Sequence, residues 1–202
     1  MDISYHDMEK ELRKLLIGFP LLTADDIQLI IEHSNIQRYK KGTILLQEGQ
    51  ISKECYSVLK GIVREYYVID GEEKTTAFYS EGMPVNAFSS YMKGEPAKHY
   101  LVCAEDCILV VGNQSLEEEM CQRIPKLESI IRKEVERLTG EAQDEFASFI
   151  TSSPEQRYLN LLETRPDLCN RVPQHQIASL LGITPESLSR IRKRIFSKKM
   201  IN

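Results

Sequence analysis

Residues 172–195 read VPQHQIASLLGITPESLSRIRKRI. The apolar residues have helical spacing up to Leu181, break at Gly182 and resume helical spacing from Leu188. Glycine adopts the left-handed backbone that ends many helices without a steric cost. The Thr-Pro-Glu at 184–186 suits the start of a second helix, because threonine can cap it and proline at the first position loses no useful donor. The stretch therefore predicts a helix-turn-helix.

The predicted second helix has a packing face and a charged face. Leu188 and Ile191 lie on the first, while Glu186, Arg190 and Lys193 line the second. An ordinary helical hairpin with a solvated charged face is the alternative interpretation. The tight turn, its threonine-proline start and the arginines that follow favour entry into a DNA major groove instead. The side chains expected to contact DNA are Gln174, His175, Thr184, Glu186, Ser187, Ser189, Arg190, Lys193 and Arg194.

The charge distribution is compatible with a nucleic-acid partner. The chain has 202 residues and a formal net charge of −4, which by itself argues against such a partner. From Thr151 onward, however, nine Lys or Arg stand against four Asp or Glu, a net charge of +5, while the first 150 residues carry −9. A small basic module on an acidic body is the pattern that attraction to phosphates requires.

Compartment and redox state follow from composition. No apolar run approaches the roughly 20 residues needed to span a bilayer. The first residues, MDISYHDMEKELRK, lack the apolar centre of a signal peptide. The five cysteines are scattered and odd in number, which fits reduced thiols. We therefore expect a cytoplasmic protein with no membrane partner.

Before the helix-turn-helix, the sequence pattern alternates between helical spacing and short β-rich runs. Residues 1 to about 37 have helical spacing, and residues 116–150 have it again. Between them, short β-rich runs punctuated by glycines predict an antiparallel barrel or jelly roll. Asp70-Gly71 is typical of a hairpin turn, because both residues tolerate positive φ. A capping sequence at 153–156 starts the next helix. The expected strands are residues 43–46, 55–59, 62–69, 74–79, 100–103 and 107–111.

The helix expected at 116–150 carries an apolar residue at every third or fourth position. Such a seam commonly pairs with its own copy, and lengthwise packing on the barrel is the alternative. Two-fold symmetry also suits a DNA-binding module, so we expect a homodimer. The expected parts are a sensing domain at 1–115, a dimerisation helix at 116–150 and a DNA-binding domain at 151–202. The expected interface residues are Ile124, Leu127, Ile131, Val135 and Leu138.

This order of parts resembles the Crp/Fnr family of bacterial transcription regulators over nearly the whole chain. The likeness is strongest in QIASLLGITPESLSRIRKRI, and Lys41-Gly42, Glu48-Gly49 and Lys60-Gly61 add to it. The resemblance implies an α+β fold with an antiparallel jelly roll of cyclic-nucleotide-binding type and flanking helices. A long dimerisation helix and a helix-turn-helix domain of winged-helix type would follow. It also implies a homodimer that binds a palindromic promoter site in double-stranded DNA, works with RNA polymerase and responds to an effector in the barrel.

By the same resemblance, the base-reading residues fall on Glu186 and Arg190. The chemistry agrees, because arginine can donate two hydrogen bonds to guanine and glutamate can accept one from cytosine. The family often has an arginine directly before that glutamate, where this chain has Pro185. We therefore expect a different operator. Only FSKKMIN follows Ile195, so we expect a truncated wing.

The expected effector pocket departs from the family. Members that bind cyclic nucleotides carry a Gly-Glu that holds the ribose and an Arg-Ser that grips the cyclic phosphate. Counting from Gly82, these positions fall on Asn86-Ala87 and near Lys98-His99. Alanine cannot accept a hydrogen bond from the ribose hydroxyl, so cyclic AMP is not the expected effector. The expected pocket consists of Asn86, Ala87, Lys98, His99 and Tyr100, and the identity of its effector stays open.

Other chemistries have less support in the sequence. Iron–sulfur sensing in the family uses clustered cysteines near the amino terminus, and here the first cysteine is Cys55. Cys103 and Cys107 are expected to be buried structural thiols, with redox sensing as the alternative. A cupin-type metalloenzyme needs two or three histidines on adjacent strands, and only His99 lies in the barrel region. We expect no metal, no cofactor and no enzymatic activity. The alternative function is a jelly-roll module for ligand or protein interaction without DNA binding.

Overall fold

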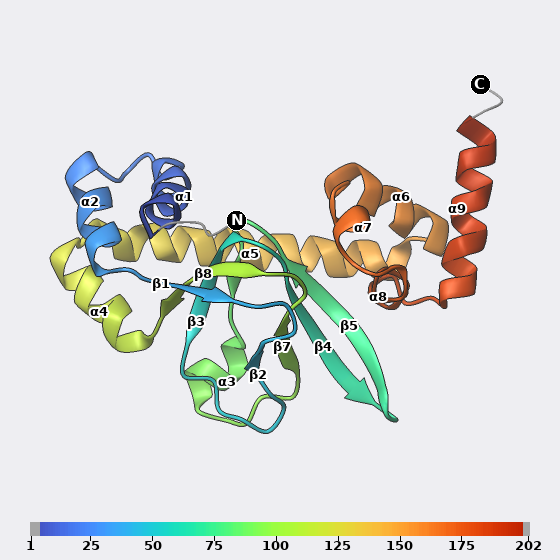
Figure 1. Cartoon of the computed structure of the whole chain (residues 1–202), viewed down its shortest axis with the longest axis horizontal. Coiled ribbons are helices and arrows are strands. Elements are labelled where there is room, and N and C mark those ends of the chain that lie inside the picture. The colour runs from blue at the N-terminus through green and yellow to red at the C-terminus, as the bar shows by residue number, and fades with distance from the viewer. Residues whose placement is uncertain (1–4, 200–202) are drawn as a thin grey trace. The chain divides into compact units, whose positions relative to one another are not determined.

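The computed structural model describes residues 5–199 as a β sandwich with helices before and after it (Figure 1). The strands are β1 (Asn35–Tyr39), β2 (Ile44–Leu46), β3 (Cys55–Lys60), β4 (Val63–Ile69), β5 (Glu72–Tyr79), β6 (Pro84–Val85), β7 (Tyr100–Cys103) and β8 (Cys107–Gly112). The helices are α1 (Tyr5–Ile17), α2 (Ala24–His33), α3 (Phe88–Lys93), α4 (Gln114–Arg123), α5 (Lys126–Thr151), α6 (Pro154–Thr164), α7 (Leu168–Arg171), α8 (Gln174–Leu180) and α9 (Pro185–Lys199).

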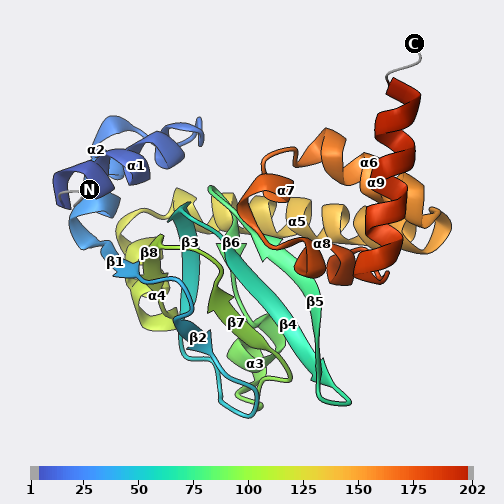
Figure 2. The ribbon, with the colours of Figure 1, turned by 45° about the vertical axis from the view of Figure 1, so that its right-hand side comes forward.

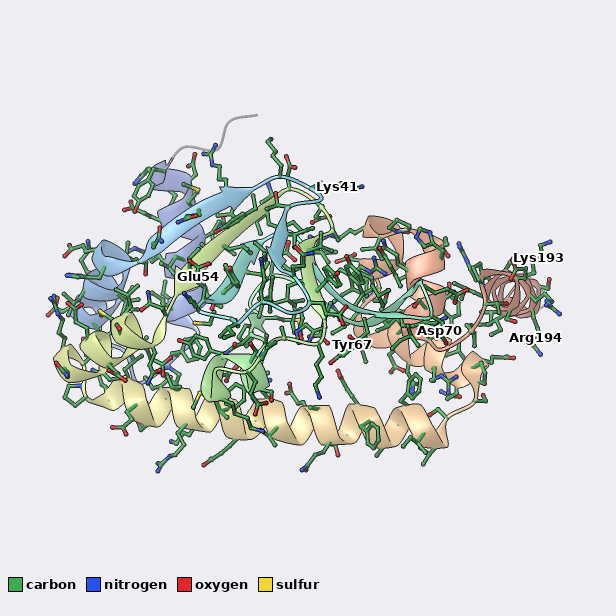
Figure 3. The ribbon with its side chains drawn as sticks, turned by 90° about the horizontal axis from the view of Figure 1, so that it is seen from below. Lys41, Glu54, Tyr67, Asp70, Lys193 and Arg194 are labelled. Atoms are coloured by element: carbon green, nitrogen blue, oxygen red, sulfur yellow. The ribbon has the colours of Figure 1, made fainter. Side chains whose placement is uncertain are left out.

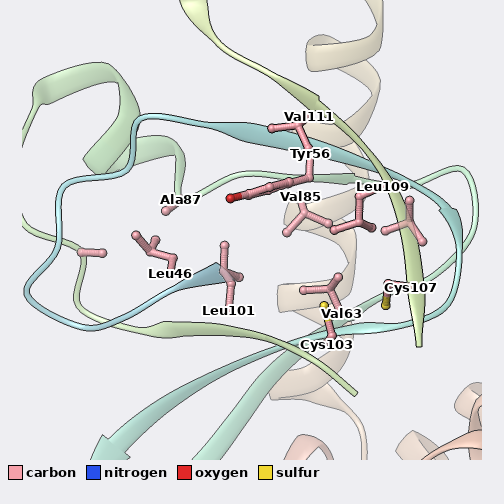
Figure 4. Close-up of a cluster of buried hydrophobic side chains, with 12 residues drawn as sticks. Leu46, Tyr56, Val63, Val85, Ala87, Leu101, Cys103, Cys107, Leu109 and Val111 are labelled. Atoms are coloured by element: carbon pink, nitrogen blue, oxygen red, sulfur yellow. The ribbon is translucent and has the colours of Figure 1, made fainter. Parts of the chain in front are cut away.

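Two four-stranded sheets form the sandwich, in the orders β1-β8-β3-β6 and β2-β7-β4-β5. β8 is central in its sheet and pairs antiparallel with both β1 and β3. Apolar side chains from both sheets form one buried cluster (Figure 4). The expected α+β class with an antiparallel sandwich is confirmed. The cluster contains Leu46, Tyr56, Val58, Val63, Val85, Ala87, Ala97, Leu101, Cys103, Cys107, Leu109 and Val111.

The two N-terminal helices cover one face of the first sheet. Their apolar residues, such as Leu12 and Ile27, form a second buried cluster with Ile36 of β1 and Ile108 of β8. The Thr23 hydroxyl caps α2 by accepting the N–H of Asp26 at 3.2 Å. The expectation of helix up to residue 37 was wrong at its end. Residues 35–37 belong to β1, because the buried Ile36 side chain faces the helices while its backbone pairs with β8.

The expected single helix over residues 116–150 is instead two helices, α4 and α5. The break falls at Ile124, whose backbone has φ −127° and ψ 81°. The next residue is Pro125, which lacks an N–H and disfavours the helical conformation of the residue before it. The uninterrupted helix therefore starts at Lys126 and runs for 26 residues.

Two compact units share the chain in a way that the sequence did not indicate. One unit holds the residues up to Glu65 together with Phe78–Arg137, and the other holds Tyr66–Ala77 together with the residues from Leu138 onward. The tip of the β4–β5 hairpin thus groups with the C-terminal helices. Its turn at Asp70-Gly71 has φ of +52° and +79°, which confirms the expected hairpin turn. The buried Thr75 donates its N–H to the Ser179 hydroxyl of α8 at 2.8 Å.

The helix-turn-helix consists of α8 and α9 (Figure 2). Gly182 ends the first helix with φ +66°, as expected. The Thr184 hydroxyl caps α9 by accepting the N–H of Ser187 at 3.2 Å. Ala178 is fully buried where the two helices approach each other. The expected truncation of the wing concerns residues after Ile195; α9 continues to Lys199, and residues 200–202 lie outside the described part of the chain.

Candidate nucleic-acid interface

α9 separates its apolar and charged residues onto two faces. Leu188 and Ile191 are buried against the rest of the C-terminal domain. Glu186, Arg190 and Lys193 are exposed, one helical turn apart. Figure 3 shows the Lys193 side chain extending outward from the helix. The structure thus brings together on one open face the three side chains that the sequence placed on the charged face of this helix.

The first turn of α9 keeps the carboxylate of Glu186 ionised. Its own backbone N–H and the Thr184 hydroxyl hydrogen-bond to the carboxylate and hold the pKa of Glu186 below its usual value. The positive end of the helix dipole acts in the same direction. Arg190 lies one turn later and donates from Nε to the backbone oxygen of Glu186 at 3.4 Å. A hydrogen-bond acceptor and a guanidinium fork are therefore neighbours on the exposed face.

Three small hydroxyl residues were also expected at the interface. Thr184 and Ser187 serve the helix cap, since the Thr184 hydroxyl oxygen accepts the N–H of Ser187 at 3.2 Å. Ser189 is exposed beside the charged residues. Of the three hydroxyl groups, that of Ser189 therefore lies outside the helix cap.

The remaining expected contacts differ in how they are held. Gln174 is hydrogen-bonded to the Arg192 guanidinium, and its side-chain nitrogen donates to the backbone oxygen of Cys169 at 3.1 Å. Arg194 forms an ion pair with Glu155 at the start of α6, with 3.1 Å between Nη2 and Oε2. His175 is exposed in the first turn of α8. Gln174 and Arg194 thus have partners within the domain that a DNA contact would have to replace or extend.

A surface depression of about 690 Å³ lies beside the charged face of α9. It runs along one side of α9 and meets the start of α8, so both helices of the motif border it. The lining residues are Gln174, Pro185, Leu188, Ser189, Arg192, Lys193 and Ser197.

The expected effector residues occupy unlike environments in the sandwich. Ala87 is buried within the core cluster, and Figure 4 shows the ring of Tyr56 with its hydroxyl end toward Ala87. Asn86 has a buried side-chain oxygen with no hydrogen-bond partner among the described residues. His99 is half-buried with Nε2 3.7 Å from Glu65, whereas Lys98 is exposed. Tyr100 is half-buried at the start of β7.

The Tyr56 hydroxyl at this core is held by Glu54, to which it donates at 2.7 Å. Burial, the bond to Glu54 and the negative charge of that carboxylate raise the pKa of Tyr56 far above its ordinary value. The tyrosine therefore stays neutral and in place. Its ring meets Tyr39 edge to face, with 6.4 Å between ring centroids.

The expected dimer residues lie along α5 with one exception. Ile124 is buried within its own protomer, at the C-terminal end of α4, so it offers little area to a partner. Leu127, Ile131 and Leu138 are half-buried, and Val135 is 42% exposed. The last turns of the helix, which lie outside the expected interface residues, carry Phe146, Phe149 and Ile150, which are 66%, 43% and 65% exposed.

Cys103 and Cys107 are both buried in the core cluster, as expected. The Cys107 thiol donates to the backbone oxygens of Glu105 and Ile62, at 3.3 and 3.4 Å. Among the described residues, no three or more His, Cys, Asp or Glu side chains gather into a group that could hold a metal ion. None of the described helices combines the length and apolar character needed to cross a membrane.

Arg157 of α6 is a residue that the sequence did not single out. Its guanidinium bonds three backbone oxygens, those of Phe149, Ser152 and Leu181, each at 3.0 Å. Sequence patterns report side-chain types and spacing, so a residue whose partners are carbonyls in three different segments leaves no signal.

Comparison with known proteins gives a family for the sandwich and a fold for the rest. Residues 36–123 match the cyclic nucleotide-binding domain family. No curated protein sequence matches the chain. Among solved structures, FixK2 from Bradyrhizobium japonicum is 18% identical with a TM-score of 0.67, covering 82% of this chain and 86% of its own.

Two other regulators share the fold over a similar extent. The c-di-GMP-responsive global regulator CLP of Xanthomonas campestris is 18% identical with a TM-score of 0.66, over 88% of this chain and 93% of its own. The catabolite activator protein of Thermus thermophilus is 20% identical with a TM-score of 0.54, over 90% and 87%. The chain is therefore similar in fold to these regulators from the sandwich through the C-terminal helices.

Proposed function

We propose that this chain is a sequence-specific DNA-binding transcription regulator of the Crp/Fnr type that acts as a homodimer. The observation that carries the proposal is the exposed face of α9. Glu186, Arg190 and Lys193 stand on a helix whose opposite side is anchored by Leu188 and Ile191. A second helix presented in this way by a preceding helix and a glycine turn is the arrangement that reads the major groove. The shared fold with the three regulators supports the proposal.

Arg190 and Glu186 would read bases, while Lys193 would neutralise a phosphate. A guanidinium can donate two hydrogen bonds to O6 and N7 of guanine, and an ionised carboxylate can accept one from the cytosine amino group. Phosphate contacts carry no sequence information but make affinity depend on salt. Substitution of a base-reading residue should therefore change sequence preference, whereas substitution of a phosphate-contacting residue should change the salt dependence of affinity.

The first experiment is selection of random duplex DNA by the purified full-length protein. We expect a two-fold symmetric consensus, and Arg190→Ala should lose preference at one base pair per half-site, by about 1–3 kcal/mol. Lys53→Ala, which removes an exposed positive charge from a loop of the sandwich, is the matched control and should leave the consensus intact. Failure of the wild-type protein to enrich any sequence, with and without candidate metabolites, would refute the proposal.

The dimer would form along α5. Val135, Leu138, Phe146 and Phe149 follow one another at helical spacing, and three of them are exposed in the protomer. Single exposed apolar residues are normal, but a row of them on one helix marks an interaction surface. A second copy of this chain presents the same row, so the two surfaces are self-complementary.

Val135→Glu tests the dimer by sedimentation. Because Val135 is exposed, the substitution should leave the folded protomer intact and yet place two like charges in a paired seam. We expect a shift from dimer to monomer. Ile17→Glu, at an apolar residue on α1 that is 64% exposed, should leave the assembly unchanged. A wild-type protein that sediments as a monomer at all concentrations would contradict the proposed assembly.

We also propose that cyclic AMP is not the effector. In the family, a glutamate carboxylate binds the ribose at the position that carries Ala87 in this chain. Ala87 is buried among apolar side chains and lies beside Tyr56. Lys98 near the expected phosphate position is exposed and offers a point charge in place of arginine's planar fork. A jelly-roll interaction module without DNA binding remains the alternative function, and it predicts no effect of Arg190→Ala.

A further inference from the structure

Arg157 joins three segments of the C-terminal unit through one side chain. It lies in the first turn of α6, and its Nη1 donates to the backbone oxygens of Phe149 and Ser152 at 3.0 Å each. Its Nε donates to the backbone oxygen of Leu181, also at 3.0 Å. The guanidinium carbon also lies 4.5 Å from the ring centroid of Phe149, which adds a cation–π contact.

The chemistry of these partners explains why an arginine stands here. The last carbonyl groups of a helix have no donor within the helix, and they carry the negative end of its dipole. Phe149 belongs to the last turn of α5, and Leu181 is the C-cap of α8. A guanidinium offers several donors in a rigid fork and a permanent positive charge. Arg157 therefore satisfies the C-terminal ends of two helices at once.

The same contact reaches the turn of the helix-turn-helix. Leu181 directly precedes Gly182, and a Cβ atom on Gly182 would lie only 3.0 Å from Cζ of Phe149. The Phe149 ring thus packs closely against the turn from which α9 starts, at Pro185. The end of α5 and the start of the recognition helix are connected by contacts that centre on Arg157.

We propose that Arg157 is a positioning residue that fixes the orientation of α8 and α9 on the end of α5. The inference rests on the proposed function, in which two copies pair along α5. In such a dimer, the orientation of α9 on α5 sets the distance between the two recognition helices, and that distance selects the spacing of the DNA half-sites. Arg157 then determines spacing selectivity without touching a base.

Arg157→Lys is the informative variant, because it keeps the charge but replaces the fork by a single ammonium group. The assay measures affinity for the selected operator and for operators lengthened or shortened by one base pair. We expect the preference for the correct spacing to fall by about tenfold, the factor that corresponds to one hydrogen bond to a charged group. The base preference within each half-site should stay unchanged, since α9 itself is intact.

A control separates positioning from stability. Leu161→Val, one turn further along α6, removes a buried methyl group and leaves the contacts of Arg157 in place. It should lower the melting temperature while keeping the wild-type spacing preference. Retention of that preference by the folded Arg157→Lys protein would overturn the inference.

A second measurement needs no DNA. Spin labels on non-natural amino acids are placed at Asp144 of α5 and Ser197 of α9, and the distance between the two labels is measured. Labelled protein is diluted with unlabelled protein, so that the distance comes from one protomer. We expect a narrow distance distribution in the wild-type background and a broader one with Arg157→Lys. Identical distributions would refute the positioning role. If the wild type selects no duplex, the proposed function fails, and this distance measurement still decides whether Arg157 orients α9.

Discussion

The substitution Ala87→Glu tests whether the sandwich interior can accept the carboxylate that cyclic-nucleotide-binding relatives use. Ala87 is 2% exposed and belongs to the apolar cluster that includes Leu46, Tyr56 and Val85. A longer side chain placed there must displace close-packed neighbours, which costs about 1–3 kcal/mol. An ionised carboxylate in the same surroundings has no positive partner within the cluster, so its pKa should rise by up to about 3 units, equivalent to about 4 kcal/mol.

The packing penalty and the penalty for burying the charge can be separated, because only the second depends on pH. A carboxyl group whose pKa is raised by folding stays protonated in the folded state, so its penalty is absent below the unfolded pKa of about 4.3. The free energy of unfolding should therefore fall as the pH rises from about 4 and level off above the folded pKa. Ala87→Gln has nearly the same volume and no charge. It should show the packing penalty without the pH dependence.

Both penalties are measured by urea unfolding of the two variants at pH 4.5, 6 and 8. Unfolding is monitored by the near-ultraviolet circular dichroism of the tyrosines. We expect Ala87→Glu to be less stable than Ala87→Gln at pH 8 and similar to it at pH 4.5. Equal stability at all three pH values would mean that residue 87 faces water or an open pocket. A rise in the midpoint of Ala87→Glu on adding cyclic AMP would refute the reasoning more strongly, since it would show that the site still accommodates the nucleotide.

Two further predictions concern stability. Gly61→Ala should cost roughly 2 kcal/mol more than Gly42→Ala in urea unfolding; both have positive φ, of +105° and +84°, but only at Gly61 would a Cβ meet Cys107 Sγ, at 2.7 Å. The bond from Lys126, with help from the cap, lowers the pKa of Asp26 to about 2. The stability that this pair adds is therefore present above the unfolded pKa near 3.8 and lost as the pH falls toward 2. Asp26→Asn should remove that part of the pH dependence of the melting temperature, and an unchanged pH profile would contradict the assignment.

Local sequence patterns predicted the elements whose determinants are close in the chain. The hairpin at Asp70-Gly71 and the turn at Gly182 depend on backbone preferences of one or two residues, and both have the expected positive φ. The strand β1 was missed because NIQRY has one aliphatic residue, and its pairing with β8 is decided by residues more than 60 positions away. The break before α5 could have been predicted, since Pro125 stands in the middle of the expected helix.

The candidate interface shows the same division between local and distant causes. The exposed face of α9 follows from helical spacing, so Glu186, Arg190 and Lys193 could be assigned from the sequence. The role of Arg157 could not, because its three acceptors are backbone atoms on other segments. The Thr75–Ser179 hydrogen bond joins residues 104 positions apart, and no pattern in either segment indicates it.

These distant contacts bear on how binding at one end of such a protein could be linked to the other. The hairpin of β4 and β5 belongs to the sandwich by its strand pairing, yet Thr75 in the middle of β5 bonds to α8 of the helix-turn-helix. Arg157 bonds the same C-terminal end of α8, at Leu181, to the end of α5. The C-terminal end of α8 is thus held by two contacts, one from β5 and one from α6 at the end of α5, and both lie within one compact unit. Both contacts lie beside the turn at Gly182, so a change in either one acts directly on the segment that leads into α9.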